Sequence, residues 1–341
     1  MMSRLLLCCI LLIVRLGRAL QNPSTVVKVS SFAVPRAPSG LYFDDGGSNL
    51  LYILSGSPRN ATGDHHLYVF TTEGQQQCLI TIPRAAGVTG VDGFYISHND
   101  TQAYIVDSQG PIWAGETRLG ASVYQVDWTD PCGCDSGTCS HSEVTWTPFG
   151  NRQWSFVTAT NANEKSSNDD GHFHGSGIVV MDKSFFGVQS VHSGDDAATP
   201  SHTSKSLVKM DMATSSRVAR WPLDGSNKDI LGRDDVDPSR LTCGPDRCVT
   251  SLVIADRNNH IYEMDLSSGK ATKEWDLKEI ALGPNDDGII TALAYARTTG
   301  YYYVGIQSTS MIHVVDLRDT VAGEADQDRE GKGPVLGVDT T

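Results

Sequence analysis

Short apolar segments of four or five residues recur along the chain in pairs, and the second segment of a pair closes on Asp in four of five cases. The pairs are 52–55 with 67–71, 105–108 with 123–127, 187–190 with 207–211, 254–257 with 261–265, and 305–308 with 312–316. Between Asp256 and Gln307 the pattern repeats without a gap at an offset of 51 residues. Self-similarity at such a period is typical of small sheets arranged radially. The pattern therefore predicts an all-β fold, a β-propeller with five repeats.

Each pair is flanked by further apolar segments, which gives the four strands expected of a propeller blade. The preceding segments are 39–43, 92–96, 176–180, 239–243 and 287–290, and the following ones are 78–82, 144–147, 218–223 and 271–277. Three of the following segments contain Trp, which we expect to pack between blades. The fifth repeat has no following segment, and the apolar run 26–34 can supply it. A ring closed by the N-terminal strand leaves no free sheet edge. The count becomes six blades if a degenerate blade lies in 149–206.

The first residues have the pattern of a secretory signal peptide. Arg4 precedes an apolar run from Leu5 to Val14, and small residues around Ala19 provide a cleavage site. The alternative is an uncleaved membrane anchor, but ten apolar residues are too few to span a bilayer. We therefore expect a signal peptide at 1–19, a single propeller domain at 25–317 and a disordered acidic tail at 318–341. The mature protein is expected to be secreted and not inserted in a membrane.

The charge of the chain narrows its partners. The formal net charge is -13, and removal of Arg4, Arg15 and Arg18 with the signal peptide makes it -16. Such an acidic protein is repelled by nucleic acids and by anionic membrane surfaces. We expect a small-molecule ligand or substrate as the partner and no nucleic acid. The sequence leaves the oligomeric state open.

Six cysteines remain after the signal peptide, an even number that favours disulfides in a secreted chain. Cys243 and Cys248 enclose turn residues and are predicted to pair. Cys78 then takes one of three remaining partners: Cys132, Cys134 or Cys139. A zinc site made by these three is the alternative. Two sequons predict glycosylation at Asn60 and Asn99.

One repeat resembles a known type. The segment from Ile254 to Tyr262, Ile-Ala-Asp-Arg-Asn-Asn-His-Ile-Tyr, resembles an NHL-type propeller repeat, and through it the gluconolactonase-like, strictosidine-synthase-like and paraoxonase-like six-bladed enzymes. The resemblance implies a propeller that is a divalent-metal-dependent hydrolase of lactones or esters, another small-molecule enzyme, or a binding scaffold. The metal-binding Glu that these enzymes have at the start of an early blade is not matched, because Ser39-Gly40 and Asp92-Gly93 stand there.

Blade geometry predicts where a site would form. The first strand of a blade begins, and its second strand ends, on the same face beside the central channel. Carboxylates at these positions are predicted to bind a divalent metal, for which Ca²⁺ is one candidate because it takes oxygen ligands: Asp92, Asp107, Asp256 and Asp287. Gln189 and Gln307 are predicted to bind substrate. In the alternative, Asp at a second-strand end accepts backbone N–H bonds from the following turn.

A second constellation is His172-Phe-His174. In an extended segment residues two apart point to one side, so both imidazoles can reach one metal or reacting group, and we predict them as catalytic residues. The alternative is a polar loop with surface histidines.

These residues support three readings of function. The sequence contains no Gly-x-Ser-x-Gly elbow, P-loop, dinucleotide fingerprint or EF-hand loop. It favours a secreted enzyme, of hydrolase type, that acts on a small organic molecule at a metal-bearing central funnel. An extracellular binding protein without catalysis is the alternative. A secreted oxidoreductase that uses the His-x-His segment is the third interpretation.

Overall fold

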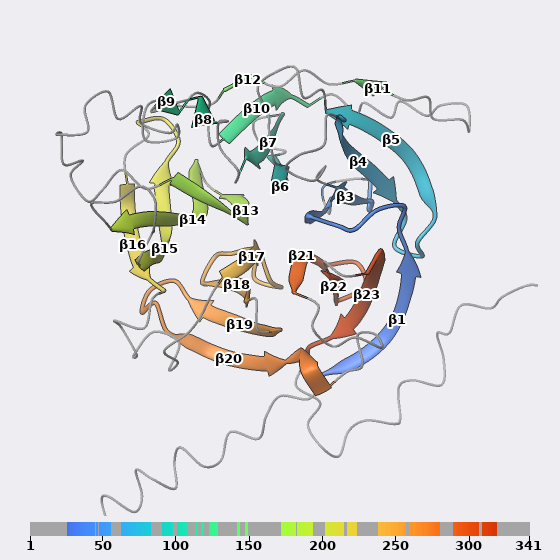
Figure 1. The fold of residues 1–341 in the computed structure, drawn as a ribbon. Coiled ribbons are helices and arrows are strands. Elements are labelled where there is room, and N and C mark those ends of the chain that lie inside the picture. Colours follow the sequence, from blue (N-terminus) through green and yellow to red (C-terminus); the bar gives the residue numbers. More distant parts are fainter. Residues whose placement is uncertain are drawn as a thin grey trace, which may run out of the picture.

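The protein is a five-bladed β-propeller, seen in a computed structural model as a ring of small sheets around a common axis (Figure 1). The residues described are 26–44, 46, 48–55, 63–82, 91–97, 101–107, 113–114, 117–118, 123–128, 142–143, 147–148, 172–181, 183–193, 202–214, 217–223, 238–256, 259–279, 289–306 and 309–318. The predicted signal peptide and nearly all of the predicted acidic tail lie outside them. The prediction of an all-β propeller is confirmed.

Blades 1 and 2 come from the first part of the chain. Blade 1 contains β2 (Gly40–Phe43), β3 (Leu51–Ser55), β4 (His65–Phe70) and β5 (Gln76–Ile82). The short β11 (Ser142–Glu143) pairs in parallel with the outer edge of β5. Blade 2 contains β6 (Val91–Ser97), β7 (Gln102–Asp107), β10 (Val123–Asp127) and β12 (Thr147–Pro148). A small hairpin, β8 (Trp113–Ala114) with β9 (Thr117–Arg118), forms a separate sheet.

Blades 3 and 4 follow in the same antiparallel order. Blade 3 contains β13 (His172–Met181), β14 (Ser184–Ser193), β15 (His202–Asp211) and β16 (Arg217–Pro222). Blade 4 contains β17 (Pro238–Thr242), β18 (Ser251–Asp256), β19 (His260–Asp265) and β20 (Ala271–Asp276), and a turn of 3-10 helix, η3 (Leu277–Glu279), follows. The described part of 149–206 therefore contributes to blade 3, and the described residues form five blades rather than six.

Blade 5 joins the two ends of the chain. It contains β21 (Ile290–Ala296), β22 (Tyr301–Ile306) and β23 (Met311–Asp316), and its fourth strand is β1 (Val27–Ala33). Strand β1 runs antiparallel to β23, from the pair Val27↔Asp316 to the pair Ala33↔Met311. Figure 1 shows this closure as a blue strand beside a red one. The predicted closure of the ring by the N-terminal strand is confirmed.

The first strand of blade 5 differs from its predicted position. The sequence pattern placed it at 287–290, whereas β21 begins at Ile290 and runs to Ala296. The reason is that Ile290, Ala292, Leu293, Ala294 and Ala296 are buried, so the packed apolar run lies beyond the predicted segment.

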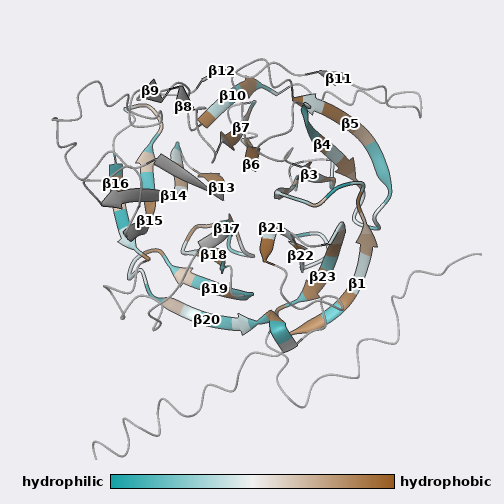
Figure 2. Cartoon of the chain, viewed as in Figure 1, coloured by the Kyte–Doolittle hydropathy of each residue, from teal (hydrophilic) through white to brown (hydrophobic). Residues whose placement is uncertain are grey.

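The core consists of five apolar clusters, one at each interface between neighbouring blades. Strand β18 shows how one strand serves two of them. Its residues Leu252 and Ile254 pack toward blade 3, and Val253 and Ala255 pack toward blade 5. Successive side chains of a strand point to opposite faces, so every residue of β18 is buried. Outer strands such as β16 and β20 are more exposed and more hydrophilic (Figure 2).

Aromatic side chains on two outer strands pack over glycines of the next blade. Trp221 of β16 lies against Gly269 in the turn between β19 and β20, and Phe32 of β1 lies against Gly74 in the turn between β4 and β5. Both glycines have positive φ, 68° and 86°. Trp275 of β20 is buried in the cluster between blades 4 and 5. These two described fourth-strand tryptophans thus pack between blades, as the sequence pattern predicts.

The turn that holds Gly269 is built by Asp265. Its carboxylate accepts hydrogen bonds from the Ser267 hydroxyl and from the Ser268 N–H and hydroxyl, each of 2.7 Å. The hydrogen bond from Ser267 is the main reason that the pKa of Asp265 falls to about 2. Asp265 is therefore a turn residue.

Replacement of Gly269 by Ala tests the packing between blades 3 and 4. Gly269→Ala is expected to lower the free energy of unfolding by about 3 kcal/mol, because the methyl group is strained at positive φ and meets the Trp221 ring. Gly300→Ala is the matched control. Gly300 has φ 71°, but the nearest atom to its added methyl would be an Arg318 nitrogen at 3.7 Å. Urea denaturation should show a clearly smaller loss for Gly300→Ala, and equal losses would contradict the role of Trp221.

Candidate functional site

An axial cavity of about 340 Å³ lies at the centre of the ring, toward the ends of the first strands. Strands β2, β6, β13 and β17 line it, together with the end of β21, so all five blades contribute. This volume is within the range of sites that hold small organic ligands, roughly 300–1,000 Å³. We call this space the axial cavity.

Three tyrosines form much of its wall: Tyr42, Tyr95 and Tyr295. The rings of Tyr42 and Tyr95 meet edge to face with centroids 4.9 Å apart. The Tyr42 hydroxyl donates a 3.0 Å hydrogen bond to the carbonyl of Ile96, which fixes this ring across the interface of blades 1 and 2. Burial raises the pKa of Tyr295, against the opposing charge of Arg318, so its phenol stays neutral. Contacts within the propeller thus hold the tyrosine rings of this wall.

The rim of the axial cavity includes the loop between β17 and β18, residues 243–250. A disulfide joins Cys243 to Cys248, as the spacing of the two cysteines predicts. Arg247 and Cys248 have positive φ, 59° and 61°, a conformation that non-glycine residues adopt only where their surroundings hold them.

Hydrogen bonds to the carboxylate of Asp246 stabilise this loop. Its carboxylate accepts hydrogen bonds from the N–H of Cys248 and from the N–H and hydroxyl of both Thr250 and Ser251, between 2.7 and 3.1 Å. Burial opposes ionisation, but the bonds from Thr250 and Ser251 outweigh it and hold the pKa of Asp246 below its usual value. The disulfide and the ionised carboxylate of Asp246 therefore both stabilise the loop that carries Arg247.

Arg297 lies on the same rim, directly after β21. Its Nη2 donates a 3.3 Å hydrogen bond to the carbonyl of Pro245, which ties blade 5 to the loop of blade 4. Two guanidinium groups, those of Arg247 and Arg297, thus line one opening of the axial cavity.

The inner end of the axial cavity is set by one position that four blades share. At this position a residue of the first strand pairs with a residue of the second strand. The pairs are Gly40 with Leu54, Gly93 with Val106, Arg240 with Ala255, and Ala292 with Gly305. Three of the four first-strand residues are small. The fourth, Arg240, is charged and buried.

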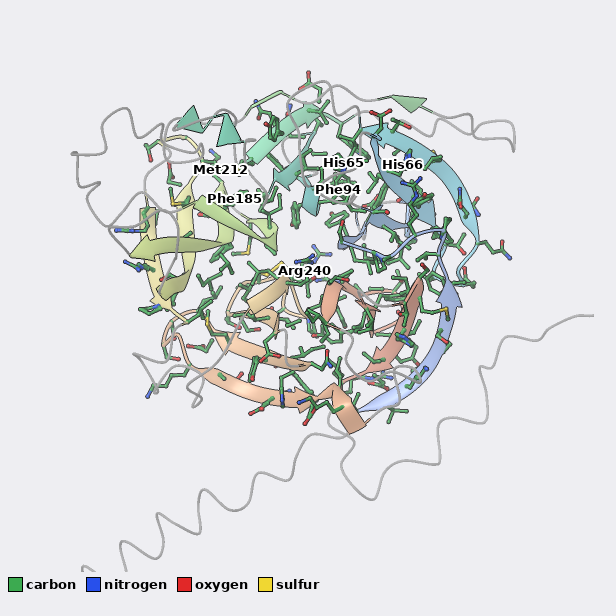
Figure 3. All side chains as sticks on the ribbon, viewed as in Figure 1. His65, His66, Phe94, Phe185, Met212 and Arg240 are labelled. Atoms are coloured by element: carbon green, nitrogen blue, oxygen red, sulfur yellow. A yellow bond between two sulfur atoms is a disulfide. The ribbon has the colours of Figure 1, made fainter. Side chains whose placement is uncertain are left out.

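The Arg240 side chain points toward the centre of the ring (Figure 3). Its Nε donates to the carbonyl of Thr291 in blade 5, and its Nη2 donates a 2.6 Å hydrogen bond to the carbonyl of Ser39 in blade 1. The guanidinium therefore spans the axis and links three blades. Glycine and alanine at the equivalent positions leave room for it.

Two hydroxyl groups complete this layer. The Ser39 hydroxyl donates to the carbonyl of Val91 in blade 2 at 3.0 Å, and the Thr291 hydroxyl donates to the carbonyl of Pro38 at 2.6 Å. Together with Arg240 these bonds connect blades 1, 2, 4 and 5 around the axis. This layer lies between the axial cavity and the face where the sequence predicts a metal site.

Asp256 is the predicted metal ligand whose side chain the structure describes. It is 1% exposed, and its carboxylate accepts hydrogen bonds from the His260 N–H at 2.9 Å and from the Tyr262 hydroxyl at 3.3 Å. Both partners belong to β19 of the same blade. This is the structural role that the sequence left open as the alternative, in which the carboxylate binds the turn that follows its strand.

Backbone register places several other predicted residues at equivalent positions. Asp107 pairs with Val91, Gln189 with Phe173, and Asp256 with Pro238. Asp92 and His174 follow directly in the irregular steps of β6 and β13, where blade 5 has Thr291. Strands thus bring Asp92, Asp107, His174 and Gln189 to one face of the ring, and their side chains lie outside the described part of the structure.

The strand pairing in blade 5 differs from the sequence pattern at two positions. In blade 5 the residue that pairs like Asp256 is Ile306, opposite Ile290, so the offset between the second strands is 50 residues and Gln307 lies one residue further on. Thr291, and not Asp287, occupies the position of Asp92. The reason is side-chain alternation: Val304 and Ile306 pack toward blade 4, and a shift by one residue would turn them away.

The remaining predictions are placed as follows. His172 lies in β13 opposite Ser190, and its side chain is outside the description. Asp287, Gln307, Asn60 and Asn99 lie outside the described residues. Cys78 of β5 is disulfide-bonded, and its partner also lies outside them.

Asp256 is the predicted metal ligand whose side chain is described, and a divalent cation at this face stays a prediction. The oxygens of Asp256 already accept hydrogen bonds within blade 4, and the guanidinium of Arg240 stands on the axis. No group of three or more His, Cys, Asp or Glu side chains suited to a metal occurs in the described part of the chain. The described residues also contain no helix with the length and hydropathy to cross a membrane.

Sequence reasoning missed the three arginines of the axis: Arg240, Arg247 and Arg297. Arg240 carried a signal, because it is the one basic residue among the five apolar first-strand segments and lies in 239–243. Arg247 and Arg297 follow such segments in turns, where arginine is common, and only the packing of blade 4 beside blade 5 brings both to the axial cavity.

Replacement of Arg240 by Met tests the axial layer. Arg240→Met keeps much of the side-chain volume but leaves the partly buried carbonyls of Ser39 and Thr291 without this donor, and we expect a loss of about 2 kcal/mol in the free energy of unfolding. Arg217→Met, at an exposed site on β16, is the control and should cost less than about 0.5 kcal/mol. Urea denaturation measures both, and a loss for Arg240→Met no larger than for the control would show that Arg240 does not hold the blades together.

Three solved structures that match most of this chain do so with TM-scores below 0.5. Glutaminyl cyclase of Myxococcus xanthus has a TM-score of 0.46 and 10% identity over 86% of this chain and 97% of its own. The WD40 domain of Pan2 from Neurospora crassa has a TM-score of 0.42 and 12% identity over 86% and 96%. Raptor of Chaetomium thermophilum has a TM-score of 0.41 and 8% identity over 85% of this chain and 29% of its own. No protein-family model matches the sequence, and no curated protein matches it.

Proposed function

We propose that this protein binds a small organic molecule in the axial cavity. The observation that carries the proposal is an axial cavity of about 340 Å³ that all five blades line with tyrosine rings, aliphatic side chains and polar groups. Concave sites of this size that combine aromatic side chains with placed polar groups are common ligand sites in proteins. Every wall residue stands on a strand of the rigid ring or on the disulfide-bonded loop, so the site is formed before the ligand arrives.

The arrangement of the axis gives the direction of entry. Arg240 and the hydroxyls of Ser39 and Thr291 form a layer beside the inner end of the axial cavity. The other end is the rim with Arg247 and Arg297. A ligand therefore enters past the loop 243–250 and comes to rest against the tyrosine rings.

Hydrolysis by a metal-bearing funnel is the alternative function. It is supported by the equivalent backbone positions of Asp107 and Asp256 on the opposite face of the ring. It is opposed by the hydrogen bonds that already occupy the Asp256 carboxylate. Binding in the axial cavity needs no metal, so the two functions differ in their response to a chelator.

We also propose that the protein is secreted, because Cys243, Cys248 and Cys78 are disulfide-bonded and such bonds persist in oxidising compartments. Expression of the full chain in cultured eukaryotic cells should release a protein that begins at Leu20. Mass spectrometry should find glycans that Asn60→Gln and Asn99→Gln remove. A cell-retained protein that still begins at Met1 would contradict this proposal.

A cavity-filling variant tests the binding function. Thr242 takes the position that Tyr42 and Tyr95 have in blades 1 and 2, two residues beyond the shared axial position. Thr242→Tyr therefore adds a ring that two other blades accommodate, and it should fill the axial cavity without loss of fold.

The measurement is saturation-transfer NMR of phenol, benzamide and benzoate with the secreted protein, with and without EDTA. At least one probe is expected to bind the unaltered protein in both conditions, and none should bind Thr242→Tyr with comparable affinity. The proposal fails if no probe binds, or if the variant binds as well as the unaltered protein. Binding that disappears in EDTA would favour the metal-dependent alternative.

A further inference from the structure

His313 is a buried titratable residue that neither the axial cavity nor the predicted metal site uses. It lies in β23, opposite Ser31 of β1 and Val304 of β22, and it is 2% exposed. Within the described part of the chain, neither of its ring nitrogens has a hydrogen-bond partner. A buried polar group without a hydrogen bond is uncommon in folded proteins and costs free energy, so it points to a role other than packing.

The imidazole faces the interface between blades 4 and 5. Ile312 and Val314 pack in the cluster toward blade 1, whereas Val315 packs in the cluster toward blade 4. Because successive side chains of a strand point to opposite faces, His313 points the same way as Val315. Its cross-strand partner Val304 belongs to the same cluster. His313 therefore stands among apolar side chains, next to the strand that closes the ring (Figure 1).

Titratable groups on every element packed against this interface bear on the charge of His313. Those described that strand alternation directs toward it are Lys28 of β1, Tyr295 of β21, Tyr302 of β22, Glu263 of β19 and Lys273 of β20, and beside it lie Lys278 of η3 and, at the end of β23, Asp316 with Arg318. Burial raises the pKa of both tyrosines, so they stay neutral. Glu263 pairs with Lys273 at 3.7 Å, and Asp316 pairs with Arg318 at 2.6 Å. Lys28 is the group among them whose charge acts on the pKa of His313, and it opposes protonation.

Burial lowers the pKa of His313 from its ordinary value of 6.5 to about 4, and the charge of Lys28 acts in the same direction. The unfolded chain therefore binds a proton at this residue at a higher pH than the folded chain does. Above the unfolded pKa both states are neutral here and His313 costs no stability. As the pH falls from 6.5 toward 4, the unfolded state gains protons that the folded state does not, and the free energy of unfolding decreases.

We propose that His313 is an acid-sensitive switch, whose protonation separates blade 5 from blade 4 and frees the closing strand β1. An imidazolium carries a charge and two N–H donors, and the apolar side chains of the cluster around Val304 and Val315 cannot accept them. Among the described strands β1 pairs with β23 alone, so no second strand holds it when blade 5 moves. The switch needs no ligand and is independent of the proposed binding function.

The same interface reaches the axial cavity. Thr242 of blade 4 and Tyr295 of blade 5 line the axial cavity from the two sides of this interface. The hydrogen bond from Arg297 to the carbonyl of Pro245 crosses the interface. Separation of the two blades therefore also loosens the loop 243–250, which gives the switch a second site of detection.

Urea denaturation of the secreted protein at pH 7.5 and pH 5.0 tests the switch. His313→Phe keeps a flat ring and cannot be protonated. Between these two pH values the unfolding equilibrium constant of the unaltered protein should rise about 25-fold more than that of His313→Phe, as a pKa of 6.5 unfolded and about 4 folded requires. At pH 5.0 most carboxylates are still ionised, so their titration adds little to this difference.

His260→Phe is the matched control. His260 is 4% exposed and lies in the third strand of blade 4, as His313 does in blade 5. Its Nδ1 lies 3.1 Å from a carboxylate oxygen of Glu274, which can pair with the charged imidazole. His260→Phe should therefore keep the full acid sensitivity of the unaltered protein.

Hydrogen exchange measured by mass spectrometry locates the change, with rates corrected for the intrinsic effect of pH. At pH 5.0 the peptides that contain β1 and the loop 243–250 should exchange at least tenfold faster in the unaltered protein than in His313→Phe. Peptides of β6 and β7 in blade 2 should exchange alike in both.

The proposal fails if His313→Phe is as sensitive to acid as the unaltered protein, or if the faster exchange is spread equally over all blades. Where the Phe ring does not fit and the variant is unfolded at pH 7.5, His313→Leu replaces it. The unaltered protein decides where neither variant folds. Faster exchange of β1 that sets in between pH 6.5 and pH 4 then supports the switch, and exchange of β1 that does not change over this range overturns it.

Discussion

Side-chain packing between neighbouring blades is the interaction on which the whole structure depends. Each of the five interfaces has its own apolar cluster, and inner strands contribute to two clusters at once. Strand β18 is buried along its full length for this reason. A fully buried Leu or Ile side chain contributes about 1.5–3 kcal/mol, so most of the stability lies between the sheets rather than within them. The ring is stable only when every interface is made.

The same packing explains how far the fold could be read from the sequence. Strands buried on both faces appear as continuous apolar runs, and the second and third strands of all blades were visible in that way. The missing fourth strand of the last repeat pointed to β1. The slip of one residue in blade 5 was not visible, because Ile306 and Gln307 both follow the apolar segment and only the facing blade decides between them.

The candidate site was harder to predict, because it depends on which ends of strands meet. Carboxylates at strand ends predict a metal, and the one described carboxylate of this set, Asp256, accepts a hydrogen bond from the start of the next strand. The axial cavity lies beyond the layer of Arg240, toward the other ends of the first strands. No spacing along the chain relates Arg247 to Arg297, because their proximity follows from the order of blades 4 and 5 in the ring. A charged residue within an apolar strand, such as Arg240, was the one available clue.

The pairing of β1 with β23 makes the two ends of the chain dependent on each other. Val27 leaves the ribosome almost 300 residues ahead of Asp316, its partner. At about 5–20 residues per second, tens of seconds separate their synthesis. Until then β1 has no partner strand, and the interface between blades 5 and 1 cannot form. Completion of this propeller is thus a late, post-synthetic event, and a nascent chain must be kept from aggregating through its unpaired first strand in the meantime.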